Sequence, residues 1–321
     1  MSETLKISVI GTGYLGATHA ACMSKLGYTV VGIDSDSAKI SVLQKGQLPF
    51  YEPGLAELLV EQLATGRLTF TTSFESAKDA DIHFLCVGTP QKAGSNAADL
   101  TYVNGAFDQL LPHLKVGSLV AGKSTVPVGT ADLLAAKLDA QAPHSDLAWN
   151  PEFLREGFAI EDTLEPNRLV VGVRKPESEK LLAELYAPLL AAGVPWISSD
   201  LRTAELVKVA ANSFLATKIS FINAMAEICE AAGGDVTVLA KAIGYDPRIG
   251  SRFLQAGIGF GGGCLPKDIR AFMARAEEIG ANQAVEFLRE IDAINLRART
   301  RMVDVVSSEL SQGLKGARIA V

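Results

Sequence analysis

Three glycines, Gly11, Gly13 and Gly16, follow directly on the apolar run Lys6–Ile10 near the start of the chain. Such a run predicts a buried strand, and the segment after the glycines predicts a helix. Between a strand and a helix, the GxGxxG spacing permits a tight turn, close approach of a pyrophosphate and close helix–strand packing. The glycines therefore predict a dinucleotide site with phosphate at the helix N-terminus.

A second apolar run, Thr29–Ile33, ends at Asp34, which lies 18 residues beyond Gly16. A carboxylate at about this spacing accepts hydrogen bonds from a ribose diol and repels a 2′-phosphate, so it favours NAD over NADP. Lys39, which we also place in the cofactor site, lies nearby, so NADP stays an alternative cofactor. The alternative is a packing turn followed by an Asp that caps a helix. Further cofactor contacts are expected in this turn and in the turn Val87–Pro90: Tyr14, Leu15 and Thr89.

Strand-like runs alternate with segments long enough for crossover helices through the first 200 residues. This alternation is typical of an α/β fold with a doubly wound parallel sheet. The expected strands are Lys6–Ile10, Thr29–Ile33, Leu68–Thr71, Ile82–Val87, Leu119–Ala121, Leu147–Trp149 and Leu169–Val173. The expected helices are Ala17–Leu26, Leu55–Ala64, Val103–Leu114, Ala131–Leu138 and Glu177–Ala191. Residues 1–200 are therefore predicted to form a Rossmann-like domain.

The pattern changes after Asp200, a candidate N-cap. The Ala-rich run Thr203–Ala232 has no Gly or Pro, and it predicts one long central helix. Much of its circumference is apolar, so its own domain and a second subunit are expected to cover it. Residues 201–313 are predicted to hold this helix and an all-α domain around one glycine-rich loop. Residues 314–321 are expected to begin a strand of a further domain.

The composition narrows the possible partners. The formal net charge is −6, without the clustered Lys and Arg of proteins that bind nucleic acid or membrane surfaces. No apolar stretch reaches the ~18 residues of a membrane span, and no signal-peptide pattern is visible. The four cysteines form no CxxC pair, which argues against a zinc site or a disulfide framework. We expect a cytoplasmic protein that binds small molecules and no metal.

Lys208 and Asn212 lie four residues apart on the predicted long helix, so they share one face. A lysine and an amide directed into one pocket would stabilise an oxyanion. The alternative is a solvated Lys208 that pairs with Glu205.

Cys264 follows the glycine-rich run 259–263 and precedes Lys267 and Asp268. Glycines let a substrate approach the backbone, and a nearby lysine favours the thiolate over the thiol. This is the setting of a nucleophile, whereas the alternative is a small buried cysteine after a flexible loop. The remaining cysteines lie within predicted helices or a strand and fit that alternative better: Cys22, Cys86 and Cys229.

The segment Asn150–Gly157 follows a predicted strand at the same edge of the sheet. Glu152 would act as a general base or contact a substrate hydroxyl. Arg155 and Glu156 are an alternative exposed ion pair. No histidine is assigned to catalysis.

Taken in order, six features resemble the family of UDP-glucose and GDP-mannose dehydrogenases along essentially the whole chain. They are the Gly11 turn, Val87–Pro90, Ser124–Gly129, Asn150–Gly157, the Lys208 and Asn212 pair, and Phe260–Asp268. The resemblance implies NAD-dependent, four-electron oxidation of the C6 alcohol of UDP-glucose to UDP-glucuronate. Cys264 would carry a thiohemiacetal and then a thioester, and Lys208 and Asn212 would stabilise oxyanions. Asp268 would move a proton or orient water, and Glu152 and Thr125 would position the hydrolytic water.

The resemblance also implies the binding residues and the assembly. Substrate would contact Glu152, Phe153, Leu154, Lys208, Asn212, Phe253, Leu254, Gln255 and Gly261, with Arg248 supplied by a partner subunit. Thr125, Glu156 and Lys267 would help to hold NAD, and the long helix would form the core of a homodimer. Because the chain stops where the family's C-terminal nucleotide-binding domain would begin, we expect a truncated form. A catalytically incomplete NAD-binding fragment is the corresponding alternative.

Two rival activities stay open. GDP-mannose dehydrogenases share the chemistry, although Pro166–Gly172 looks more like the UDP-glucose branch; the Lys267 and Asp268 pair makes the UDP-N-acetylmannosamine branch a weaker match. Two-electron hydroxyacid dehydrogenases also carry a Lys and an Asn four residues apart. Cys264 discriminates against them.

Overall fold

The computed structural model describes residues 4–310 and 313–320, and the chain divides into two compact units. The first unit runs to Pro90 and then over Ala98–Lys208, and the second holds Gln91–Ala97 and the chain from Val209 onward. The division falls inside one long helix rather than at residue 200. Each unit has its own buried core.

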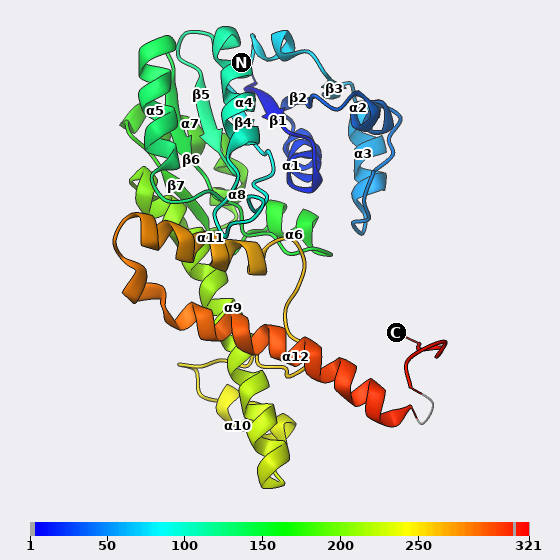
Figure 1. Ribbon diagram of the computed structural model, residues 1–321. Helices are drawn as coiled ribbons and strands as arrows, with labels where there is room; N and C mark the ends of the chain where they lie inside the picture. Colours follow the sequence, from blue (N-terminus) through cyan, green and yellow to red (C-terminus); the bar gives the residue numbers. More distant parts are fainter. Residues whose placement is uncertain (1–3, 311–312, 321) are drawn as a thin grey trace. The chain divides into compact units, whose positions relative to one another are not determined.

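The first unit is built on an eight-stranded sheet, with strand order β3-β2-β1-β4-β5-β6-β7-β8 (Figure 1). The strands are β1 (Lys6–Ile10), β2 (Thr29–Ile33), β3 (Leu68–Thr71), β4 (Ile82–Leu85), β5 (Leu119–Gly122), β6 (Asp146–Trp149), β7 (Leu169–Gly172) and β8 (Trp196–Ser199). From β1 the chain adds strands first toward one edge of the sheet, to β3, and then toward the other edge, from β4 to β8. This is the topology of a doubly wound sheet, and the predicted α/β class is confirmed.

Two features of the sheet differ from the expectation. β6 and β7 are antiparallel, with Trp149 opposite Gly172, so the last two strands run against the other six. Antiparallel strands at the edge of an otherwise parallel sheet are common. The strand β8 was missed because its sequence, Trp-Ile-Ser-Ser, is short and only half-buried and lacks an extended apolar run.

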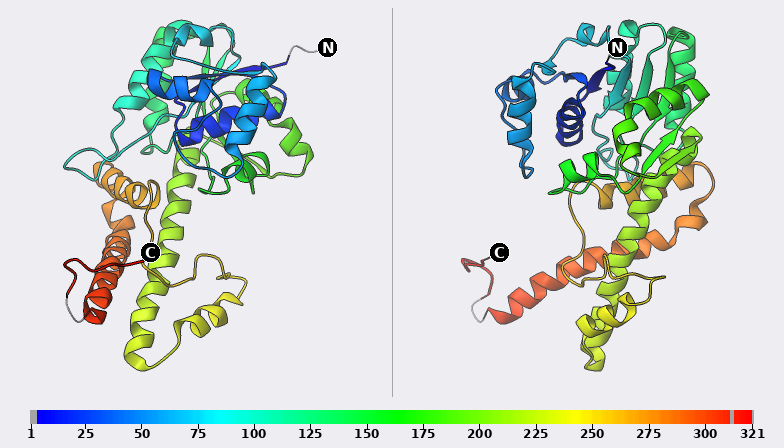
Figure 2. Two further views of the ribbon diagram at one scale, coloured as in Figure 1. Left: turned by 90° about the vertical axis from the view of Figure 1, so that its right-hand side faces the viewer. Right: turned by 180° about the vertical axis from the view of Figure 1, so that it is seen from behind.

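Helices cover both faces of this sheet (Figures 1 and 2). One face buries α1 (Tyr14–Lys25), α2 (Ser37–Gln44), α3 (Leu55–Ala64), α6 (Ala159–Leu164), α7 (Pro176–Leu185) and α8 (Ala187–Ala191). The other buries η1 (Phe74–Ala77), α4 (Thr101–Leu110), η2 (Leu111–His113), α5 (Thr130–Gln141) and the first turn of α9 (Leu201–Ala232). The alternation of strand side chains assigns them to these two cores: Ile7 and Val9 enter the first, and Ile10 enters the second. The single helix predicted over Glu177–Ala191 is two helices, broken at Tyr186 ahead of Pro188.

The second unit is helical, as predicted. It contains most of α9 together with α10 (Val236–Gly244), α11 (Leu265–Glu278), η3 (Asn282–Val285) and α12 (Phe287–Glu309). Asp200 caps α9 as expected, because its carboxylate accepts a hydrogen bond from the Thr203 N–H at 2.9 Å. Helix α12 packs on α9, where the Ser220 hydroxyl donates to the Ile291 carbonyl oxygen at 2.8 Å (Figure 1).

The strand expected at the C-terminal end is not formed among residues 313–320. This segment is a turn, in which the Ala317 N–H donates to the Leu314 carbonyl oxygen, and no strand within the described part of the chain pairs with it. Val321 lies outside the described residues. Within the described chain, no helix combines the length and the apolar character needed to cross a bilayer.

Candidate active site

The glycine turn has the geometry that close approach of a dinucleotide requires. Gly11 has φ +88°, in the left-handed region that favours glycine. A Cβ on Gly16 would lie 1.8 Å from the Gly11 carbonyl oxygen, whereas a Cβ on Gly13 would meet nothing within 4 Å. The first and third glycines are therefore required by the protein itself. The second leaves open space at the N-terminus of α1, where a pyrophosphate would be placed.

The Asp34 carboxylate is held firmly at the end of β2. It accepts hydrogen bonds from the Thr12 N–H at 2.8 Å, the Asp36 N–H at 3.0 Å and the Lys39 ammonium at 2.8 Å. Burial acts to raise the pKa of Asp34, but these bonds outweigh it and the pKa lies below its usual value. The ammonium of Lys39 is thus neutralised by Asp34, so it is not set apart to receive a 2′-phosphate.

A cleft of about 480 Å³ lies along this edge of the sheet, lined by Gly11, Gly13, Asp34, Lys39 and the turn after β4. Thr89 lies in that turn, and its hydroxyl donates to the Thr125 carbonyl oxygen at 2.7 Å. The structure therefore joins two residues that we expected to contact the cofactor. The side chains of two others point elsewhere. The Tyr14 hydroxyl binds Glu52, and Leu15 lines a separate cavity.

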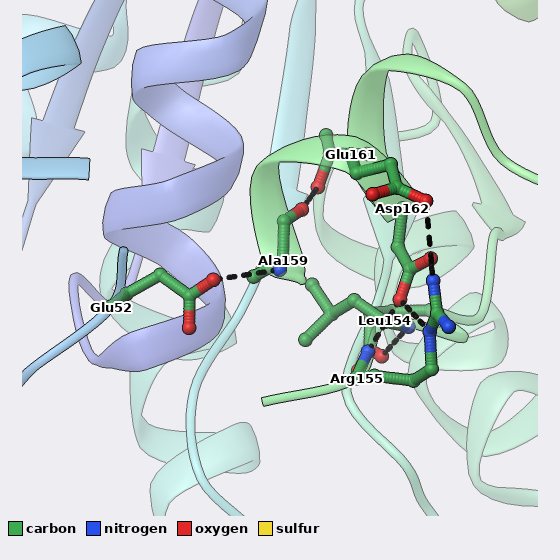
Figure 3. A network of polar contacts seen from close by, with 8 residues as sticks. Glu52, Leu154, Arg155, Ala159, Glu161 and Asp162 are labelled. Carbon is green, nitrogen blue, oxygen red and sulfur yellow. Dashed lines mark hydrogen bonds and ion pairs between the residues drawn. The ribbon is translucent and has the colours of Figure 1, made fainter. Parts of the chain in front are cut away.

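The loop after β6 is fixed by a carboxylate that the sequence analysis missed. Glu52 is buried and accepts hydrogen bonds from the N–H groups of Gly157 and Ala159, both at 2.8 Å. Figure 3 shows the bond from Ala159. Arg155 makes its ion pairs with Asp162 and Glu161, so the suggested pair with Glu156 is wrong (Figure 3). Glu52 is distant in sequence from this loop, and no pattern near it predicts the contact.

Lys208 is buried and faces this loop. Its ammonium lies 3.7 Å from a carboxylate oxygen of Glu152 and 5.5 Å from the centre of the Phe153 ring. The alternative of a solvated Lys208 paired with Glu205 is wrong. Glu205 instead accepts hydrogen bonds from the N–H groups of Gly129 and Ala131 at the start of α5. Sequence spacing could not distinguish these cases, because Lys208 lies on α9 and its partner, Glu152, lies in the loop after β6, far away in sequence.

Behind Glu152 lies a buried polar cluster centred on Lys123. Its ammonium donates to the Asn150 side-chain oxygen at 2.9 Å, and the Tyr186 hydroxyl donates to the same oxygen at 2.7 Å. Burial lowers the pKa of Lys123 to about 8. Asn150 also donates to the Val170 carbonyl oxygen, so it ties the ends of β5, β6 and β7 together. Sequence reasoning passed over Lys123.

The second unit contains the expected nucleophile, Cys264, and its neighbours. Cys264 is exposed and directly precedes α11. One turn further on, the Asp268 carboxylate is 3% exposed and accepts hydrogen bonds from the Asn212 amide at 2.7 Å and the Lys267 ammonium at 2.6 Å. Of the four cysteines, all within the described residues, the other three are buried. Burial raises the pKa of the Cys86 thiol to about 12, which makes it a poor nucleophile.

The remaining expected substrate residues lie in two further parts of this unit. Arg248 is largely exposed and pairs with Asp246. Leu254 is buried, whereas Phe253 and Gln255 are exposed, and Phe253 has φ +63°. Gly261 belongs to the loop before Cys264. Glu156, which was expected to help hold the cofactor, is exposed in the first unit.

A doubly wound sheet with a tight glycine turn, a strand-end carboxylate and a cleft at the carboxyl edge defines a dinucleotide-binding oxidoreductase of the Rossmann type. Comparison with known families refines this class. Residues 5–190 match the NAD binding domain of the UDP-glucose/GDP-mannose dehydrogenase family, and residues 202–297 match its central domain. The chain belongs to this family.

Named relatives lie in several branches of the family. UDP-glucose 6-dehydrogenase of Rickettsia conorii is 44% identical over 99% of this chain and 72% of its own length. The structure of a UDP-glucose dehydrogenase from Pyrobaculum islandicum matches with TM-score 0.86 and 38% identity over 97% of this chain and 71% of the other. The structure of a GDP-mannose dehydrogenase from Pseudomonas aeruginosa matches with TM-score 0.71 and 32% identity, over 94% of this chain and 71% of the other chain.

Proposed function

We propose that the chain oxidises the C6 alcohol of UDP-glucose to the carboxylate of UDP-glucuronate, with NAD as the cofactor and Cys264 as the nucleophile. The observation that carries the chemistry is the exposed thiol of Cys264, placed one turn before the buried carboxylate of Asp268. The choice of UDP-glucose is supported by the higher identity to the UDP-glucose branch than to the GDP-mannose branch.

The first unit has the features that NAD needs. Gly13 leaves space for a pyrophosphate at the N-terminus of α1, and the Asp34 carboxylate suits a ribose diol. Because Lys39 is paired with Asp34, a 2′-phosphate would meet a carboxylate rather than a free cation. When bound, NAD supplies the hydride acceptor for each of two successive oxidations. Thr89, Thr125, Glu156 and Lys267, with the backbone of Tyr14 and Leu15, are proposed to complete its site.

The protein side chains would carry the remaining chemistry. In the first oxidation the alcohol loses a proton and a hydride, and Lys208 and Asn212 stabilise the developing oxyanion. The Cys264 sulfur then bonds to the aldehyde carbon, and the carbonyl oxygen becomes the hydroxyl of a thiohemiacetal. Loss of a second hydride and a proton gives a thioester. Water held by Glu152 and Thr125 adds to the acyl carbon, the carbon–sulfur bond breaks, and the thiol is regenerated.

Two aspects of this geometry support these roles. Cys264 lies at the N-terminus of α11, where the first N–H groups of a helix carry partial positive charge. Asp268 is held in one orientation by Asn212 and Lys267, which suits a group that moves a proton or orients water. Thr125 and Glu152 follow the neighbouring strands β5 and β6.

The assembly is part of the same proposal. Three large apolar side chains on α9, Phe214, Phe221 and Ile228, are spaced seven residues apart and are largely exposed. A stripe with this spacing suits pairing with a second helix, and we propose a homodimer through α9, with Arg248 supplied to the partner's substrate site. The cytoplasmic location expected from the sequence stays a prediction.

The decisive experiment measures NADH and uronate formed from UDP-glucose by the wild-type chain and by Cys264→Ala. The wild type is expected to form two NADH for each uronate. The variant is expected to lose normal formation of the acid. Cys229→Ala, which changes a buried cysteine of α9, serves as the matched control. Unchanged acid production by Cys264→Ala would contradict the thioester route. Faster turnover of GDP-mannose than of UDP-glucose would instead assign the chain to the GDP-mannose branch. If no nucleotide sugar gave NADH, the alternative of a catalytically incomplete NAD-binding fragment would be favoured.

A further inference from the structure

The loop that precedes Cys264 has few side chains that could hold it in place. Five of the seven residues 257–263 are glycines, and one of the two others, Ile258, is exposed. Glycine has the greatest backbone freedom of all residues, so an unanchored loop of this composition would sample many conformations. The position of the thiol therefore depends on what anchors this loop to the rest of the second unit.

Phe260 provides the anchor, and one side chain of α12, that of Asn295, binds both of its backbone polar groups. The Asn295 side-chain oxygen accepts from the Phe260 N–H at 2.7 Å, and the Asn295 amide donates to the Phe260 carbonyl oxygen at 2.9 Å. Asn295 is 1% exposed. A planar amide that makes both bonds mimics a strand neighbour and fixes the orientation of the peptide groups on either side of Phe260.

Neighbouring contacts tighten this arrangement. Arg299, one turn further along α12, donates a second hydrogen bond to the Phe260 carbonyl oxygen at 2.6 Å. Gly259 has φ +91°, and a Cβ there would lie 2.2 Å from the Asn295 side-chain oxygen. The Asn223 side-chain oxygen of α9 accepts from the Gly257 N–H at 2.8 Å. The loop is thus fitted closely around the Asn295 amide.

The Phe260 ring adds a third restraint, because it is buried in the core of the second unit with Ile269 of α11 and Leu288 of α12. On the other side of Cys264, α11 begins at once, and the Asp268 N–H donates to the Cys264 carbonyl oxygen at 3.0 Å. Only Gly261, Gly262 and Gly263 separate the two restraints. Cys264 therefore lies between a clamped residue and a helix.

We propose that Asn295 is a positioning residue for the Cys264 thiol: by clamping the backbone of Phe260 it holds the glycine loop so that the sulfur meets the aldehyde carbon. This inference rests on the proposed function, since it concerns the step in which the thiol traps the aldehyde. Arg299 supports the same clamp. Neither residue contacts the reacting atoms in this proposal, and both act through the loop.

The test uses Asn295→Ala and the milder Asn295→Asp, which keeps an acceptor for the Phe260 N–H and loses the donor to its carbonyl oxygen. Thr300→Ala, at an exposed position of the same helix, is the control. A misplacement of about 1 Å costs reactions of this kind about 100-fold, so thiol addition should slow by about 10- to 100-fold. Free aldehyde, captured with a hydrazide reagent, should then accumulate, and NADH per uronate should exceed two. The KM for NAD should stay within about twofold of the wild type.

A purely structural role would give a different result. If Asn295 only stabilised the fold, the variants would lose total activity while the ratio of aldehyde to acid stayed at the wild-type value, and that outcome overturns the proposal. Amide hydrogen exchange provides a readout that needs no turnover. The Phe260 N–H, which donates to Asn295, should exchange faster in Asn295→Ala than in the wild type and in Thr300→Ala, at temperatures well below unfolding. Should the wild type form no NADH from UDP-glucose, the proposed function fails, and exchange alone decides whether the clamp exists.

Discussion

Lys123 is buried and has no carboxylate within ion-pair distance among the described residues, so replacing it tests the energetics of this fold directly. Burial lowers its pKa from the ordinary 10.5 to about 8. At 1.36 kcal/mol for each pKa unit, this shift corresponds to about 3 kcal/mol. Below pH 8 the lysine is charged in both the folded and the unfolded chain, and the folded chain bears the whole cost of burying that charge.

The sign of the pH dependence follows from proton binding. Between pH 8 and 10.5 the unfolded chain holds the lysine proton and the folded chain does not. The contribution of Lys123 to the free energy of unfolding therefore rises with pH across this range and is constant on either side. Lys123→Met removes the charge at a similar volume and loses the hydrogen bond to Asn150, which is worth about 1 kcal/mol. Tyr186 still donates to the same Asn150 oxygen.

The variant should accordingly be about 2 kcal/mol more stable than the wild type at pH 7 and about 1 kcal/mol less stable above pH 10.5. Urea denaturation at pH 7, 8.5 and 10, at fixed ionic strength, measures this difference. Lys45→Met, at an exposed position, controls for the loss of a lysine as such. A difference between wild type and Lys123→Met that does not change with pH would refute the reasoning.

Two further predictions concern the first unit. Asp34→Ala should raise the KM for NAD by about 10- to 100-fold and weaken discrimination against NADP, because bonds to a charged group are worth about 1.5–3 kcal/mol; equal steady-state constants for variant and wild type would contradict the assignment. Burial lowers the pKa of His83 to about 3 from 6.5, so the unfolded chain gains a proton first as the pH falls. The free energy of unfolding should therefore drop by about 3 kcal/mol between pH 6.5 and 4 through this group, and His83→Gln should flatten that part of the curve.

Much of the fold was predictable because its signals are local. Strands β1, β2 and β3 begin and end at the residues expected from their apolar runs, and α9 follows from an uninterrupted run without Gly or Pro. The direction of β7 and the existence of β8 were not predictable. Those features depend on which strand edge is free for pairing, and β8 is too short and polar to stand out.

The candidate site divides in the same way. Gly11, Asp34 and Cys264 could be proposed from the sequence because their residue types and spacing alone suggest a role. Glu52 and Asn295 were missed because each acts on backbone groups distant in sequence, at Ala159 and Phe260 respectively. An isolated Glu or Asn carries no sign of such a partner.

The sequence by itself determined the class of fold, the place of the dinucleotide turn and the residue types available for chemistry, since these depend on periodicity and on short spacings. The tertiary structure decided which groups are charged, buried and paired. It places Lys208 beside Glu152 rather than Glu205. It also pairs Lys39 with Asp34 and binds the Phe260 backbone to Asn295. These contacts join residues that only chain folding brings together, and burial in a low-dielectric interior sets their energies.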